Sequence, residues 1–274
     1  MYEAYWGLTE KPFENTPNAR FFYRSRQHEE ALARMLYVVH ERKGAAVLTG
    51  DYGCGKTLLN RVLWQELQSE NQFQAVNILD PSLSAHELIQ EIVYQLSGAP
   101  APQVKIDLFH TLHNLLYANH KAGRHNIIVV DEAQLIKEPA IFEELRLLLN
   151  FQLDNAFLLT IILLGSSELQ QIIDGLPHLA QRLAARFHLV SLSQEETRFY
   201  IEHRLKIAGA TRQVFNDGAF GEIFAGSAGV PRNINNICDL ALVDGFSNNL
   251  EIVDAKAIVE INNELRPPVA RASL

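Results

Sequence analysis

Five short apolar runs, separated by segments with helical spacing, are the feature that most constrains the fold. The runs are rich in leucine and β-branched residues and hardly alternate with polar ones, which is typical of parallel strands buried on both faces. They are AAVLT (45–49), FQAVNIL (73–79), NIIVVD (126–131), FLLTIILLG (157–165) and RFHLVSL (186–192). The sequence therefore predicts an α/β domain with a parallel sheet flanked by helices.

Helix signals between the runs support this prediction. The segment SAHELIQEIVYQLSG has apolar residues at helical spacing, and Ser84 followed by Glu87 forms the pattern of a capping box. A second helical pattern, VKIDLFHTLHNLLYANHKAG, follows a short linker at 98–103. After Leu192 only helical patterns remain, as far as Leu265. We therefore place a domain boundary near residue 192.

The composition excludes several classes of protein. The chain has 274 residues, 47% of them hydrophobic, enough for one large α/β domain and a smaller helical one. A net charge of −8 provides no overall attraction to nucleic acid or to an acidic membrane.

The cysteines indicate the compartment. Cys54 and Cys238 lie in unlike settings, which favours a reducing compartment over a disulfide framework. With no signal peptide and no apolar stretch of about 18 residues, we expect a cytoplasmic protein that reaches a membrane only through a partner.

The segment GDYGCGKT, from Gly50 to Thr57, matches G-x-x-x-x-G-K-[ST] between the first run and a helical pattern. Glycines let backbone N–H groups wrap a triphosphate, and the following helix N-terminus adds positive potential. We expect Lys56 to reach the β- and γ-phosphates and Thr57 to offer its hydroxyl to Mg²⁺. The alternative, an exposed lysine on a glycine-rich turn, is disfavoured by the position between strand and helix. The expected nucleotide contacts are Gly50, Asp51, Tyr52, Gly53, Cys54, Gly55, Lys56, Thr57 and Leu58.

Two acidic residues follow the run IIVV. Asp131 at the strand end is suited to hold Mg²⁺, and Glu132 beside it is suited to polarise an attacking water. Alone, this pair would be read as two solvated carboxylates at a strand end, but together with the phosphate loop it predicts nucleotide hydrolysis. The chain has no N-K-x-D stretch to recognise guanine, so we expect ATP.

Two further residues extend the predicted site. Ser166 follows the run 157–165 and could present its hydroxyl to the γ-phosphate or to the water. It could equally cap the helix SELQQIIDG. Arg232 follows Pro231 at the start of a helical pattern, where it could reach the phosphates or simply be solvated.

Together these motifs resemble an AAA+ ATPase, with GDYGCGKT as Walker A, IIVVDE as Walker B, Ser166 at the sensor-1 position and GVPR, ending in Arg232, as sensor 2. The opening MYEAYWGLTEKPFENTPNARFFYRSRQHEEALARMLY resembles the general secretion pathway protein A (ExeA-type) family, which includes the mannose-sensitive haemagglutinin pilus biogenesis ATPase. The resemblance implies a P-loop NTPase sheet followed by an all-helical lid. Its expected parts are an N-terminal arm and first helix packed on the core (1–44), the nucleotide-binding domain (45–192), the lid (193–265) and a tail (266–274).

The resemblance also implies a function. It implies a bacterial ATPase that uses ATP and Mg²⁺ to drive its oligomerisation and the assembly of a secretion or type IV pilus system, with partners at the inner membrane. Arg182 and Arg186, expected on one helical face before the last strand, are candidates for an arginine that enters a neighbouring subunit's site. The alternative for either is an ordinary arginine at a helix end. A different function, an ATP-dependent DNA-binding adaptor of a transposition system, fits the same core, but the acidic charge and the opening segment disfavour it.

Overall fold

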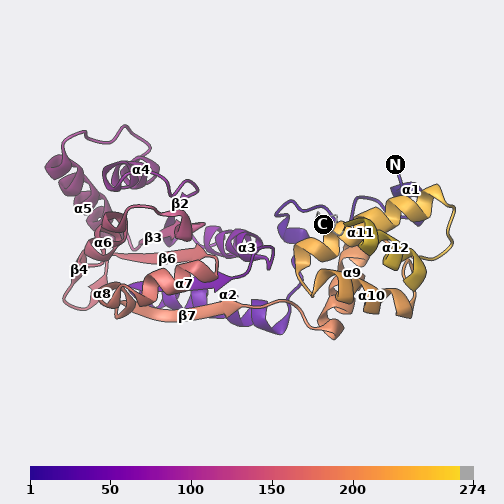
Figure 1. Ribbon diagram of the computed structural model, residues 1–274. Helices are drawn as coiled ribbons and strands as arrows, with labels where there is room; N and C mark the ends of the chain where they lie inside the picture. The colour runs from indigo at the N-terminus through magenta and orange to yellow at the C-terminus, as the bar shows by residue number, and fades with distance from the viewer. Residues whose placement is uncertain (266–274) are drawn as a thin grey trace, which may run out of the picture. The chain divides into compact units, whose positions relative to one another are not determined.

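The computed structural model describes residues 1–265 and divides them into two compact units (Figure 1). The α/β unit comprises residues 26–52 and 56–190. Among the described residues, the helical unit comprises 1–25, 53–55 and 191–265. The segment 1–44 is thus divided between the two units, because its aromatic residues and its helix pack against different cores. The expected tail, 266–274, lies outside the described residues.

A five-stranded parallel sheet forms the centre of the α/β unit, in the order β2-β3-β6-β1-β7. Its strands are β1 (Ala45–Gly50), β2 (Phe73–Ile78), β3 (His125–Val130), β6 (Leu159–Gly165) and β7 (Leu183–Leu189). A small antiparallel pair, β4 (Gln152–Leu153) and β5 (Ala156–Phe157), precedes β6. The predicted parallel sheet is confirmed, although the last strand begins and ends three residues earlier than expected.

Helix α2 (Arg26–His40) precedes β1, and further helices occupy the connections between the strands. They are α3 (Lys56–Gln68), α4 (Ala85–Ser97), α5 (Lys105–Lys121), the 3-10 helix η2 (Ala133–Leu135), α6 (Pro139–Leu148), α7 (Ser167–Asp174) and α8 (Pro177–Ala180). The capping box of α4 is confirmed: the Ser84 side chain accepts from the Glu87 N–H, and the Glu87 carboxylate accepts from the Ser84 N–H.

Both faces of the sheet are buried. One row of side chains crosses the strands in register, from Ile78 through Val130 and Leu163 to Val47, and packs with apolar residues of α4 to α8. Alternate residues point to the other face and are also fully buried; among them are Ala46, Leu48, Val129 and Ile162. Helix α2 contacts β1, β6 and β7, and α3 contacts β1 and β2. This two-sided burial explains why the strands read as continuous apolar runs.

The helical unit has its own apolar core. Its main helices are α9 (Gln194–Ile207), α10 (Asp217–Ser227), α11 (Pro231–Ser247) and α12 (Ala255–Leu265), and the N-terminal residues add α1 (Glu3–Trp6) and the 3-10 helix η1 (Ala19–Phe21). Trp6 is fully buried, and its Nε1 donates to the Leu242 carbonyl at 2.9 Å. A Cβ on Gly245 would lie 2.6 Å from the Trp6 ring, so glycine makes room for it. The N-terminal arm is therefore an integral part of this core.

A buried guanidinium fastens the arm to α9. Arg204 is 4% exposed, and its Nε and Nη2 donate to the carbonyls of Pro12 and Glu14 at 2.6 and 3.0 Å. Its Nη1 donates to the Tyr200 hydroxyl and to Asn235, and the group lies 5.0 Å from the centre of the Phe21 ring. Carbonyls, neutral side chains and ring faces thus satisfy this cation.

We expect Arg204→Met to lower the free energy of unfolding by about 2–4 kcal/mol, because two arm carbonyls and their neighbours lose buried donors. Urea unfolding followed by circular dichroism measures the change. Arg212→Met is the matched control, since this exposed arginine also donates to an arm carbonyl, that of Tyr5. An equal loss in both variants would contradict a special role for the buried guanidinium.

A neutral histidine lies in the sheet. His125 is buried at the start of β3, and its Nε2 lies 2.8 Å from Thr160 Oγ1. The Thr160 hydroxyl donates to the Lys43 carbonyl at 2.6 Å, so the His125 ring is the donor of the pair. Burial, together with the smaller effects of the charges of Arg42 and His120, lowers the pKa of His125 to about 4.

This depressed pKa predicts a loss of stability in mild acid. Between about pH 6.5 and pH 4 the unfolded chain binds a proton that the native His125 does not, so the free energy of unfolding falls as the pH decreases, by about 3 kcal/mol in all. Urea titrations at pH 7, 6 and 5 should show a smaller fall in His125→Gln than in the wild type. The exposed His110, replaced by glutamine, is the control and should leave the slope unchanged. Equal slopes in all three proteins would refute the assignment.

Candidate functional site

The carboxyl ends of β3, β6 and β1 meet at one edge of the sheet. Strand β6 lies between the other two and pairs in parallel with both, with Thr49 beside Gly165 and Val130 beside Leu163. The phosphate loop leaves β1, Asp131 follows β3, and Ser166 follows β6. The sheet therefore brings together three segments that lie far apart in the sequence, at the edge where open parallel sheets bind ligands.

The phosphate loop has the backbone that its glycines predict. Gly53 and Gly55 have φ angles of 83° and 98°, in the left-handed region that favours glycine. A Cβ on Gly50 would lie 2.7 Å from the Leu189 carbonyl oxygen, so the loop starts where β1 and β7 approach closely. Helix α3 begins at Lys56, and its N-terminus adds positive potential beside the loop.

Lys56 lies folded over this loop. Only 5% of the residue is exposed, and Nζ donates to the carbonyls of Gly50 and Asp51 at 2.8 and 3.1 Å. The same atom lies 5.7 Å from the centre of the Tyr52 ring. The alternative of an exposed lysine on a turn does not hold for this structure.

The carboxyl group of Asp131 is buried close to the loop. The residue is 5% exposed, and Oδ1 accepts from the Glu132 N–H at 2.9 Å. Burial raises the pKa of Asp131, while the Glu132 N–H, the charge of Lys56 and a hydrogen bond with Thr57 oppose the rise. A hydroxyl and a carboxylate placed together are hard oxygen donors of the kind that Mg²⁺ prefers, so Thr57 and Asp131 fit this ion.

Glu132 occupies an unusual backbone position. Its φ and ψ are 49° and 38°, in the left-handed region that costs a non-glycine residue of order 1 kcal/mol. The chain turns there from β3 into η2, and the Leu135 N–H donates to the Glu132 carbonyl at 2.8 Å. The half-buried Glu132 side chain accepts from Gln134 Nε2 at 2.6 Å. Sequence reasoning did not single out Gln134, because its partners become neighbours only when the sheet forms.

Ser166 is the N-cap of α7. It is buried, and its Oγ accepts from the Glu168 N–H at 3.3 Å, so the structure shows the capping geometry. The Ser166 N–H donates to Gln134 Oε1 at 3.0 Å. The next hydroxyl, that of Ser167, donates to Asp51 at 3.4 Å and so links the end of β6 to the phosphate loop.

The expectation that Arg182 and Arg186 share a helical face is wrong. Helix α8 ends at Ala180, and Arg186 lies inside β7, where it pairs with Val47 of β1. Pairing with β1 holds this segment extended. Arg182 donates to Asn150 at 3.2 Å, and Arg186 forms an ion pair with Asp174 at 2.8 Å.

Arg232 lies in the first turn of α11, directly after Pro231, as the sequence predicts. Its backbone N–H donates to the Gly53 carbonyl at 3.3 Å, within the unit that includes residues 53–55.

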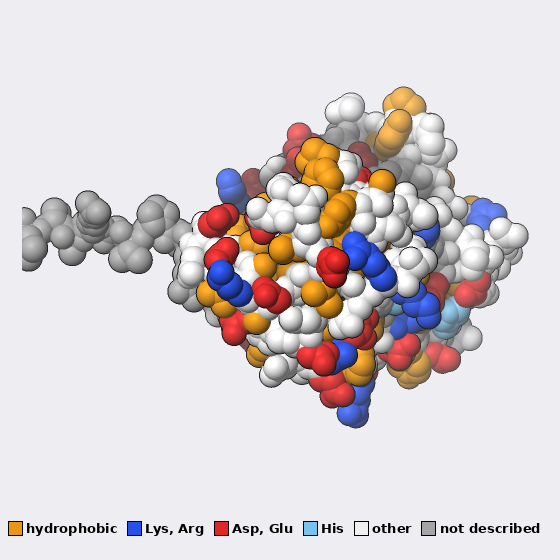
Figure 2. All heavy atoms as spheres, turned by 90° about the vertical axis from the view of Figure 1, so that its right-hand side faces the viewer, with side chains coloured by type: hydrophobic (Ala, Val, Ile, Leu, Met, Phe, Trp, Pro, Cys, Tyr) orange, Lys and Arg blue, Asp and Glu red, His pale blue; other side chains and the backbone are white. Residues whose placement is uncertain are grey.

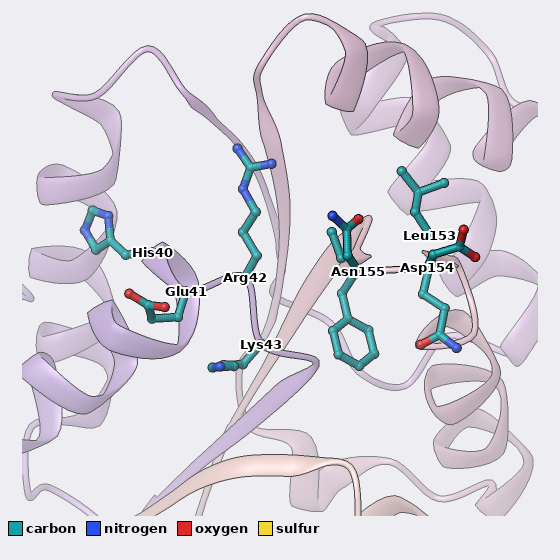
Figure 3. Close-up of a pocket in the computed structure, with 10 residues that line it drawn as sticks. His40, Glu41, Arg42, Lys43, Leu153, Asp154 and Asn155 are labelled. Carbon is teal, nitrogen blue, oxygen red and sulfur yellow. The ribbon is translucent and has the colours of Figure 1, made fainter.

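A pocket of about 670 Å³ lies at the opposite edge of the sheet (Figure 3). Arg42 and Lys43, in the chain that leads into β1, form one side of it, and Asp154 and Asn155 of the β4-β5 hairpin form the other. Acidic and basic side chains are balanced there, since Glu41 also lines it. The pocket lies at the amino-terminal ends of β1 and β6, whereas the phosphate loop follows the carboxyl-terminal end of β1. The two sites are therefore separate.

Comparison with known proteins identifies the family. A family model described as an AAA domain matches residues 39–173. The general secretion pathway protein A of Aeromonas hydrophila is 39% identical over 251 residues, which are 90% of this chain and 45% of that protein. The chain belongs to the AAA+ ATPases of the general secretion pathway protein A type. It spans a little under half the length of this relative.

Solved structures support the AAA+ fold. The Aeropyrum pernix ORC2 protein, in ADPNP and ADP complexes, has a TM-score of 0.69 at 18% identity and covers 93% of this chain and 71% of its own. Cdc6p of Pyrobaculum aerophilum has a TM-score of 0.71 at 15% identity, covering 94% of this chain and 72% of its own. Thermotoga maritima RuvB has a TM-score of 0.59 at 16% identity, and the match covers 89% of this chain and 70% of the RuvB chain. The expected fold class is thereby confirmed. Within residues 1–265, no helix is both long and apolar enough to cross a membrane.

Proposed function

We propose that this AAA+ ATPase binds ATP with Mg²⁺ at the carboxyl edge of its sheet and hydrolyses it. We further propose that turnover drives oligomerisation and the assembly of a bacterial secretion or type IV pilus system. The observation that carries the proposal is the strand order β3-β6-β1, which gathers the phosphate loop, Asp131 with Glu132, and Ser166 at one edge. These are the groups that phosphoryl transfer to water requires.

Each residue has a role in this proposal. Backbone N–H groups from Gly50 to Leu58 surround the phosphates, and Lys56 exchanges its loop carbonyls for the β- and γ-phosphates. Thr57 and Asp131 hold Mg²⁺, which when bound neutralises phosphate charge. Glu132 accepts a proton from the water whose oxygen attacks the γ-phosphorus, and ADP leaves.

Other residues complete the site in the assembled state. Ser166 senses the γ-phosphate from the end of β6, and Arg232 contacts the nucleotide from the start of α11. Arg182 or Arg186 supplies the arginine that enters the site of a neighbouring subunit. To do so, Arg182 would have to release Asn150, or Arg186 would have to release Asp174. Such an arginine accelerates hydrolysis by about 10³-fold or more.

The name of the Aeromonas hydrophila relative supports the secretion context. The proposed partners are secretion or pilus assembly proteins, which hold the ATPase at the cytoplasmic side of the inner membrane. The net charge of −8 disfavours duplex DNA as the main partner. The face in Figure 2 agrees with this, because acidic and basic side chains are intermingled there among apolar ones.

Two substitutions test the chemistry. We expect Lys56→Ala to abolish ATP turnover and weaken ATP binding, because the loop loses its charge. Glu132→Gln should keep bound ATP and lower kcat by about 10²- to 10⁴-fold, the usual contribution of a general base. Phosphate release and fluorescent-nucleotide binding measure the two effects. Lys43→Ala, at the opposite edge of the sheet, is the matched control. Wild-type turnover in Lys56→Ala would overturn the proposal.

Assembly is tested by light scattering on Glu132→Gln with Mg·ATP, with ADP and without nucleotide. We expect a closed oligomer with ATP alone, because the trapped γ-phosphate keeps the arginine of a neighbouring subunit engaged. The same measurement with duplex DNA separates the two functions. If the mass increases only when DNA is added, the transposition-type adaptor replaces the secretion-type assembly factor.

A further inference from the structure

The side chain of Gln134 links the ends of two strands. Its Oε1 accepts from the Ser166 N–H at 3.0 Å, and its Nε2 donates to Glu132 Oε2 at 2.6 Å. The residue is 8% exposed; its hydrogen bond with Ser166 is buried, and its hydrogen bond with Glu132 is partly buried. Gln134 thus connects the glutamate after β3 to the backbone where β6 ends.

These partners fix the orientation of the amide. A backbone N–H can only donate and an ionised carboxylate can only accept, so the oxygen of Gln134 must face Ser166 and the nitrogen must face Glu132. Glutamate at this position would turn a second carboxylate toward Glu132, and leucine would bond to neither partner. Among side chains of this size, glutamine supplies the required donor and acceptor together.

The surrounding backbone makes room for this amide. A Cβ on Gly165 would lie 2.6 Å from Gln134 Oε1, so the glycine that ends β6 leaves the space that the amide occupies. Glu132 itself has a left-handed backbone that starts η2, the helix carrying Gln134. The backbone turn and the amide therefore both determine where the Glu132 carboxylate lies.

We propose that Gln134 is a positioning residue for hydrolysis: it holds Oε2 of Glu132 and leaves Oε1 to accept the proton of the attacking water. The inference rests on the proposed function, in which Glu132 is the general base. Its hydrogen bond with the Ser166 N–H also connects Glu132 to the end of β6, the strand that lies between β3 and β1.

Gln134→Leu and the isosteric Gln134→Glu test the inference. We expect each to lower kcat by about 10- to 100-fold while KM and the Kd for ATP change by less than about threefold, because the amide orients the base and binds no phosphate. In the Glu132→Gln background, Gln134→Leu should cause little further loss in single-turnover rate, since it acts through Glu132.

Gln95→Leu is the matched control. Gln95 on α4 also accepts from a backbone N–H, that of Asn77 at 3.0 Å, and donates to a carboxylate, that of Glu91 at 2.6 Å. The Gln95→Leu substitution should lower the midpoint of thermal unfolding about as much as Gln134→Leu does, but it should leave kcat unchanged. Circular dichroism establishes that each variant is folded.

The outcomes separate the two proposals. If Glu132→Gln removes turnover but both Gln134 variants hydrolyse ATP at the wild-type rate or faster, the positioning role is overturned and the proposed function stands. A rise in the Kd for ATP equal to the fall in kcat/KM would also overturn it, because Gln134 would then act in binding. If Lys56→Ala and Glu132→Gln retain wild-type turnover, the proposed function itself fails.

Discussion

The parallel pairing of β3, β6 and β1 is the constraint on which the candidate site depends. Parallel strands end at the same edge, so whatever follows each strand comes together there. Because side chains alternate between faces, a slip of one residue in β6 would exchange the row that packs on α4 to α8 with the row on the opposite face. It would also shift Ser166 along the edge relative to the phosphate loop and Asp131, so the observed register sets the positions of these residues.

Two charged groups are buried at this edge of the α/β unit. The ammonium of Lys56 bonds to two backbone carbonyls, and the buried carboxyl group of Asp131 has a raised pKa because burial disfavours its charge. A cation beside Asp131 would offset that penalty, and phosphate oxygens would be stronger partners for Lys56 than carbonyls are. The electrostatics of the chain therefore suit a ligand that carries both charges, such as a magnesium nucleotide.

Local patterns in the sequence predicted the strands, and most of their ends to within one residue, because burial on both faces leaves continuous apolar runs. The start of β7 was placed too late, since Leu183, Ala184 and Ala185 have little preference for a strand and this stretch is extended because Leu183 and Ala185 pair with β1. The same pairing invalidates the helical spacing assumed for Arg182 and Arg186. Gln134 could not be found from sequence, because the Ser166 N–H that it bonds lies thirty-two residues away.

The opening segment carries much of the family resemblance, yet its aromatic side chains serve the fold. Trp6, Phe13 and Phe21 are all at least 96% buried in the core of the helical unit, and Arg204 ties the backbone between them to α9. Rings that are buried in this way cannot contact an assembly partner unless the arm detaches, which would expose the apolar core and the Arg204 guanidinium together. A surface that binds a protein partner must therefore be formed by residues other than these three rings.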